Sequence, residues 1–172
     1  MPPKKKAAPK RKLDVKPQPA PAVGKAAPAF SLMSDAGEEI SLKSLKGKNV
    51  VLYFYPKDFT PGCTAEACAF RDNYTTIAEH DAVIFGVSSD SEASHTAFRE
   101  RHQLPFPLIA DPAREVHRLY QAVGLIPWMP PRITYVIDRH GIIRAAIRHD
   151  FRVTQHVPEV IAALESINRE VD

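Results

Sequence analysis

The two cysteines of the chain lie in one short stretch, PKDFTPGCTAEACAFR, at residues 56–71. Cys63 and Cys68 are five positions apart, whereas a metal knuckle or a thioredoxin-type redox pair usually has two residues between its thiols. On one intact helix this step puts the two Cα atoms roughly 8.6 Å apart. A disulfide needs Cα atoms within about 7 Å. The two thiols therefore either never pair, or pair only after the first helical turns unwind.

The position of Cys63 favours chemistry on this thiol. The run NVVLYFY (49–55) predicts a strand, and the residues beyond Gly62 favour a helix that begins near Thr60 and Pro61. Free N–H groups and the positive dipole at a helix start stabilise an anion, and the thiolate is the reactive form of cysteine. Cys63 is therefore a candidate nucleophile.

Other hypotheses for the cysteines stay open at this point. Cys68 also suits the role of a small buried apolar residue. No second ligand pair for zinc is evident, and we expect no metal and no organic cofactor. The nearest histidine is His80, so a cysteine hydrolase would need a histidine from a distant part of the chain.

Alternating apolar and helical patterns predict an α/β fold with a central mixed sheet flanked by helices. The turn RHG at 139–141 predicts that the last two strands form an antiparallel hairpin. Residues 30–48 suggest a small hairpin or irregular cover. We expect strands at 49–55, 82–89, 107–110, 132–138 and 142–147, and helices at 63–80, 91–102, 113–123 and 155–170.

The first 28 residues have a different composition from the rest. They contain eight lysines and arginines but one acidic residue, Asp14, and few large apolar side chains, so we expect a disordered tail over 1–28 and one folded domain over 29–172. The motif KKKAAPKRK resembles a nuclear-localisation signal and could also contact nucleic-acid phosphates. The alternative is a solubilising extension without a partner. The domain is acidic, so nucleic acid is expected through the tail only.

The chain has no apolar run long enough for a membrane span and no secretory signal. We therefore expect no membrane partner. The expected location is the cytoplasm, with the nucleus as the alternative that the basic tail suggests.

The segment PKDFTPGCTAEACAFRD resembles the active-site segment of the peroxiredoxins, and more narrowly the peroxiredoxin Q group, also called bacterioferritin comigratory protein. Pro56, Thr60 and Cys63 match the family pattern, and Cys68 matches the resolving cysteine that many members have five residues later. The similarity extends from about Ala29 to the C-terminus, through GVSSDS and RITYVID. It implies a thioredoxin-like fold and the reduction of hydroperoxides.

The resemblance also implies a reaction cycle. The Cys63 thiolate attacks the peroxide and becomes a sulfenic acid, which Cys68 converts to an intramolecular disulfide. Thioredoxin or a similar dithiol then reduces the disulfide. We expect the chain to act as a monomer.

The remaining site residues follow from the same resemblance. The Thr60 hydroxyl, the N–H groups of the helix start and Arg132 would hold the peroxide oxygens. Pro56 would shape the loop and shield the thiolate, and Glu66 would orient Arg132. The alternatives are a surface ion pair for Arg132 and an ordinary first-turn acid for Glu66. Trp128, in LIPWMPP (125–131), would cover the pocket or a reductase docking site, or belong to the core.

Two other functions compete with a peroxidase. A thiol–disulfide oxidoreductase shares the fold but would place its cysteines as C-x-x-C, and it would not need Thr60 or Arg132. A nucleic-acid-associated redox sensor would bind through the tail and signal through the cysteines.

Overall fold

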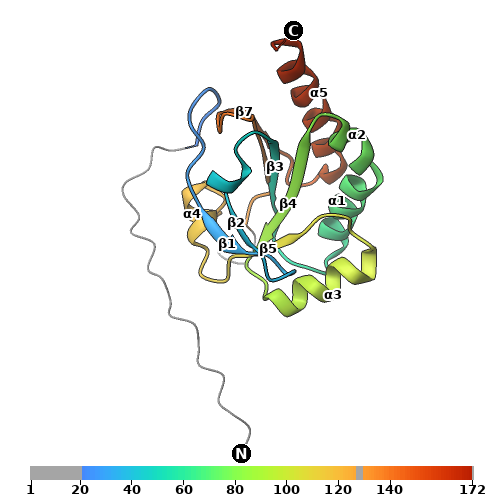
Figure 1. Ribbon diagram of the computed structural model, residues 1–172. Helices are drawn as coiled ribbons and strands as arrows, with labels where there is room; N and C mark the ends of the chain where they lie inside the picture. The colour runs from blue at the N-terminus through green and yellow to red at the C-terminus, as the bar shows by residue number, and fades with distance from the viewer. Residues whose placement is uncertain (1–20, 127–129, 172) are drawn as a thin grey trace, which may run out of the picture.

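The computed structural model describes residues 21–126 and 130–171, and its centre is a five-stranded sheet with the strand order β5-β4-β3-β6-β7 (Figure 1). β3 pairs in parallel with β4, and β4 with β5, whereas β6 and β7 join on the other side of β3 as antiparallel strands. The strands are β3 (Asn49–Phe54), β4 (Ala82–Ser88), β5 (Leu108–Ala110), β6 (Ile133–Ile137) and β7 (Ile143–Arg148). The predicted mixed sheet and its closing hairpin are confirmed.

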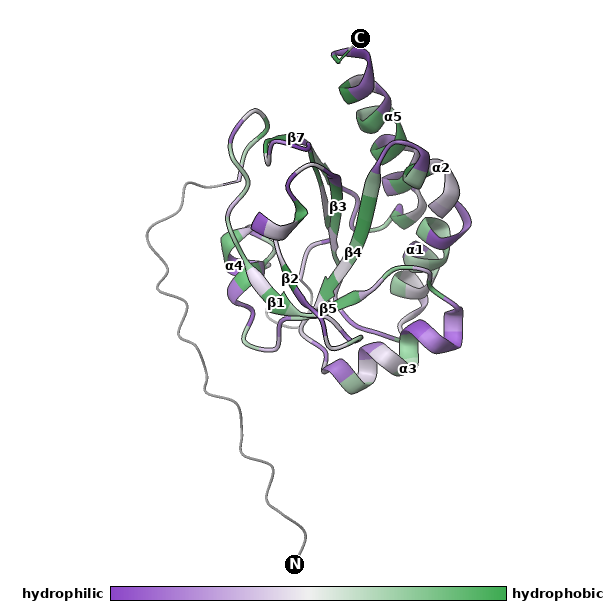
Figure 2. Ribbon diagram, viewed as in Figure 1, coloured by the Kyte–Doolittle hydropathy of each residue, from purple (hydrophilic) through white to green (hydrophobic). Residues whose placement is uncertain are grey.

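Helices cover both faces of this sheet, and Figure 2 shows apolar residues concentrated in its central strands. Alternate residues of β3 point to opposite faces, so Val51 and Tyr53 belong to one apolar core and Val50 and Leu52 to the other. The first core lies under α1 (Pro61–Asp72), α2 (Tyr74–Glu79), α3 (Glu92–His102) and α5 (His156–Arg169). The second lies under α4 (Glu115–Leu119) and the small hairpin of β1 (Ser31–Met33) and β2 (Glu39–Ser41). Two 3-10 turns complete the elements, η1 (Lys43–Leu45) and η2 (Val153–Gln155).

Two predicted helices differ from the observed ones. The helix expected over 63–80 is divided at Asn73, whose backbone leaves the helical region (φ −109°, ψ 12°) and whose side-chain amide donates to the carbonyl of Ala69 at 2.9 Å. The helix expected over 113–123 is shorter, because Arg114 and Gln121 on either side of α4 have left-handed φ values of 54° and 52°.

The folded domain begins before Ala29, which corrects the expected boundary. Residues 22–28 run along the β6–β7 hairpin, where the N–H of Gly24 donates to the carbonyl of Ile143 and the N–H of Ala27 to that of Gly141, each at 2.8 Å. The buried hydroxyl of Tyr120 donates to the carbonyl of Pro28 at 2.7 Å. Residues 1–20 of the expected tail, and Trp128, lie outside the described residues.

None of the helices in the described ranges has the length and apolar character that a membrane crossing requires.

Candidate active site

Cys63 lies in the first turn of α1, directly after the loop that leaves β3. Thr60 has an extended backbone (φ −80°, ψ 149°) and Pro61 is the first helical residue, so the predicted helix start is confirmed. The Thr60 side chain does not cap the helix. Its hydroxyl donates to the carbonyl of Lys57 at 2.9 Å, a hydrogen bond within the loop between β3 and α1. Cys63 is only 1% exposed.

Arg132 donates hydrogen bonds to two other predicted site residues, Cys63 and Glu66. It precedes β6, next to β3 in the sheet, and its Nη1 donates to Cys63 Sγ and to Glu66 Oε2, both at 3.2 Å. Gly62 makes room for this contact, since a Cβ at Gly62 would lie 2.6 Å from Arg132 Nη2. The structure thus brings together the side chains of Cys63, Glu66 and Arg132, although Cys63 and Arg132 are 69 residues apart in sequence.

Glu66 is fully buried on the next turn of α1. Burial raises the pKa of its carboxyl to about 8, although the charge and hydrogen bond of Arg132 act in the opposite direction. Its Oε1 atom has no hydrogen-bond partner and lies 3.9 Å from Nδ1 of His156.

His156 begins α5 and is also completely buried. Its Nε2 faces the carbonyl of His149 at 3.2 Å, and its Nδ1 faces the hydroxyl of Thr134 at 2.8 Å. Burial is the largest cause of its lowered pKa. A neutral ring that donates from Nε2 and accepts from Thr134 at Nδ1 satisfies all of these contacts.

A buried polar cluster holds the loop before α1. Oδ1 of Asp58 accepts from the hydroxyl of Tyr55 at 2.6 Å, and its Oδ2 accepts from Ser94 at 2.8 Å and from His95 Nδ1 at 2.7 Å. The N–H of Asp58 donates to Asp90 at 2.8 Å. Asp58, Asp90 and His95 could offer ligand atoms to a cation, but they already bind one another, so this cluster fits a structural role.

Cys68 lies on the same helix as Cys63 and is partly exposed. Both thiols are free, and α1 is continuous from Pro61 to Asp72. Because the two cysteines share one intact helix, a bond between the two sulfurs requires α1 to change shape.

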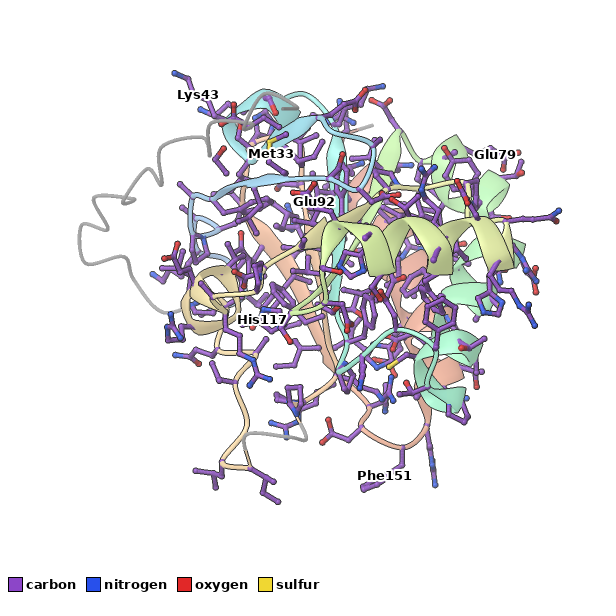
Figure 3. All side chains as sticks on the ribbon, turned by 90° about the horizontal axis from the view of Figure 1, so that it is seen from below. Met33, Lys43, Glu79, Glu92, His117 and Phe151 are labelled. Carbon is purple, nitrogen blue, oxygen red and sulfur yellow. The ribbon has the colours of Figure 1, made fainter. Side chains whose placement is uncertain are left out.

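A cavity of about 540 Å³ opens beside the site. Pro56 and Arg132 both line it, together with the proline pair at 130–131 and mostly apolar side chains. Phe151 stands at its rim and points away from the body of the molecule, where it is 86% exposed (Figure 3). The space is larger than hydrogen peroxide needs.

Sequence reasoning missed four residues of this site. Gly62 could have been suspected, because it directly precedes the nucleophile and its lack of a side chain had no other explanation. Asp58 stands in the quoted segment itself. His95 and His156 gave no local signal, since their partners are brought close only by the fold.

The fold and the site together define a thiol-dependent redox protein with a thioredoxin-like sheet. The model of the AhpC/TSA family matches residues 23–146. The chain therefore belongs to this family and is a peroxiredoxin of the peroxiredoxin Q and Bcp group.

Curated relatives and solved structures agree. Peroxiredoxin Bcp of Bacillus subtilis is 42% identical over 154 residues, covering 86% of this chain and 98% of that protein. The chloroplastic peroxiredoxin Q of Suaeda salsa is 40% identical over 145 residues, covering 84% and 68%. The bacterioferritin comigratory protein of Xanthomonas campestris, in a structural study of its alkyl peroxide reduction, is 30% identical with a TM-score of 0.73, covering 80% and 90%.

Proposed function

We propose that this peroxiredoxin, a thiol peroxidase by its family, reduces hydroperoxides with Cys63 as the nucleophile. The observation that carries the proposal is the hydrogen bond from Arg132 Nη1 to Cys63 Sγ at the start of α1. A guanidinium against a sulfur at a helix start stabilises the thiolate. The same guanidinium is a positive charge close to the place where the leaving peroxide oxygen becomes negative.

The chemistry follows from this arrangement. The Cys63 thiolate attacks the terminal peroxide oxygen, the O–O bond breaks, and the sulfur loses two electrons to become a sulfenic acid. Negative charge moves to the leaving oxygen, so fixed donors must face that oxygen. Arg132, the helix N–H groups and the Thr60 hydroxyl would supply them, with Thr60 turning from its present bond to Lys57. Pro56 would limit the access of water.

Cys68 is proposed to resolve the sulfenic acid. Its thiol condenses with Cys63–SOH, a disulfide forms and water leaves. Because both residues belong to α1, the first turns must unwind before the sulfurs meet.

The disulfide is then reduced by an external dithiol, for which we propose thioredoxin acting on a monomer of this chain. The cytoplasm is the proposed location, with the nucleus and nucleic-acid contact as alternatives that depend on the basic residues before the domain.

The proposed substrates are hydrogen peroxide and organic hydroperoxides. The Xanthomonas campestris relative is described as reducing alkyl peroxides. The largely apolar cavity beside Arg132 supports the same substrate class here.

Peroxide consumption in the presence of thioredoxin and its reductase tests the proposal. Cys63→Ser should abolish turnover. Cys68→Ser should consume about one equivalent of peroxide per chain and then stop or over-oxidise, because the sulfenic acid has no second thiol to meet. Retained turnover in Cys63→Ser would rule out Cys63 as the nucleophile, and normal cycling of Cys68→Ser would rule out its resolving role. Mass spectrometry of the oxidised wild type should find the Cys63–Cys68 bond.

A further inference from the structure

Three titratable side chains meet under the first turns of α1, and one cation faces two groups that can each carry a negative charge. Nη1 of Arg132 lies 3.2 Å from Cys63 Sγ and 3.2 Å from Glu66 Oε2. The side chain of Arg132 is 12% exposed and that of Glu66 is not exposed at all. The protein therefore has to balance these charges with little help from water.

Two anions beside one guanidinium would leave an uncompensated buried charge, which is costly. An ionised Glu66 would also leave its Oε1 atom charged and without a hydrogen-bond donor. His156, 3.9 Å away, does not act as a second cation, because its Nδ1 accepts from Thr134 and its pKa is lowered by burial. Tyr53, on the strand beneath α1, is neutral, since burial raises its pKa well above the usual value. Glu66 thus holds a proton while Cys63 is a thiolate.

We propose that Glu66 is a proton store for Cys63, protonated while the sulfur is a thiolate and ionised once the sulfur is oxidised. This inference rests on the proposed function. When the thiolate takes the terminal OH group of the peroxide, the leaving alkoxide or hydroxide needs one proton to become an alcohol or water. Glu66 gives up that proton. The sulfenic acid is neutral, and the Glu66 carboxylate then becomes the anion that pairs with Arg132.

The rest of the cycle balances in the same way. Condensation of Cys68–SH with Cys63–SOH releases water and changes no charge. The external dithiol then supplies two electrons and two protons. One proton stays on Cys68 and the other returns to Glu66, which restores the Cys63 thiolate. The net charge beside Arg132 is the same at each stable stage. The protons pass between the protein, the peroxide and the dithiol, and none is exchanged with the solvent.

A single-turnover proton count tests the proposal on the full chain. The reduced protein receives one equivalent of hydrogen peroxide near pH 9 in weak buffer with a pH indicator, and thiolate absorbance verifies that Cys63 begins ionised. Wild type should take up close to no proton per chain. Glu66→Gln keeps the shape and can still accept from Arg132, but it has no proton to give. It should take up about one proton per chain, because the released hydroxide is neutralised from solvent.

The pH dependence of the proton count has a definite direction. Burial raises the pKa of Glu66 to about 8 against the charge and hydrogen bond of Arg132, with no contribution from a Cys63 thiolate. This value therefore describes Glu66 beside a neutral sulfur, and a thiolate would raise the pKa further. The difference in proton uptake between Glu66→Gln and wild type should rise from zero toward one per chain as the pH rises through about 8, because below that pH Glu66 keeps its proton after oxidation.

Infrared difference spectra give a second readout, and the wild-type spectrum can contradict the proposal without any variant. Oxidation of wild type should remove the C=O stretch of a protonated carboxyl, and Glu66→Gln should lack this change. Glu165→Gln, an exposed acid on α5, is the matched control and should behave as wild type.

The possible failures are distinguishable. If wild type consumes peroxide but takes up one proton per chain above about pH 8, or retains the carboxyl band there, the proton store is wrong and the peroxidase stands. Absence of the Cys63 thiolate in the reduced protein also overturns the store. If wild type consumes no peroxide, the proposed function fails and the store fails with it.

Discussion

At the scale of single residues, the position of Arg132 depends on the absence of a side chain at Gly62. A Cβ there would lie 2.6 Å from Nη2 of Arg132. The guanidinium would have to move away from Cys63 and Glu66. We expect Gly62→Ala to lower kcat/KM for peroxide by roughly a hundredfold, the usual effect of losing one well-placed donor. The free energy of unfolding should change by less than about 1 kcal/mol, because alanine suits a helix.

Stopped-flow peroxide kinetics and urea unfolding check this expectation. Ala65→Ser is the control, since it changes an exposed residue on the same helical turn and should leave both quantities near wild type. A Gly62→Ala protein with full activity would show that Arg132 does not need its present position.

The residues of the site divide into those that sequence could predict and those that it could not. Cys63, Arg132 and Glu66 match a pattern of residue types at a helix start and a strand start, so the family resemblance reaches them. His156 has no such pattern, because it meets Glu66 only when α5 packs against α1 and β6. Long-range packing of this kind leaves no local mark in one sequence.

At the scale of elements, the loop between β3 and α1 is fixed by buried hydrogen bonds that Asp58 makes with α3. Nδ1 of His95 faces Asp58 at 2.7 Å and its Nε2 faces the carbonyl of Ile109 at 3.2 Å. The Asp58 carboxylate also accepts from the hydroxyls of Tyr55 and Ser94. In Asp58→Asn one acceptor oxygen becomes an N–H₂ group that cannot accept. A buried donor would lose its partner, and we expect a loss of about 1–3 kcal/mol in unfolding free energy.

Chemical unfolding of Asp58→Asn, His95→Gln and their combination tests these hydrogen bonds. The double variant should lose less stability than the sum of the two single losses, because the two residues share a hydrogen bond. Asp72→Asn is the control, since the bond between Asp72 and Arg71 lies at the surface and should contribute less than about 1 kcal/mol. Equal losses for Asp58→Asn and the control would mean that these hydrogen bonds do not hold the loop.

At the scale of the whole molecule, the apolar runs were sufficient to predict the sheet, since strands buried on both faces are continuous stretches of β-branched and aromatic residues. The expected start of the domain at residue 29 was wrong for a physical reason. Residues 22–28 join the fold through backbone hydrogen bonds to the β6–β7 hairpin, and such bonds do not depend on side-chain type. This segment, AVGKAAP, therefore resembled the tail in composition while belonging to the domain.

Two deletions distinguish the contribution of residues 22–28 from that of the residues before them. Removal of residues 2–20 should leave the unfolding free energy and the peroxide turnover unchanged. Removal of residues 2–28 takes away the backbone bonds of Gly24 and Ala27, and it leaves the buried Tyr120 hydroxyl without the carbonyl of Pro28. A buried donor without an acceptor costs about 1–3 kcal/mol, so the urea midpoint should fall by a corresponding amount. Equal midpoints for the two deletions would contradict the role of residues 22–28. Because this strip crosses the far end of the hairpin from Arg132, the longer deletion should lower stability more than the rate at which Cys63 reacts.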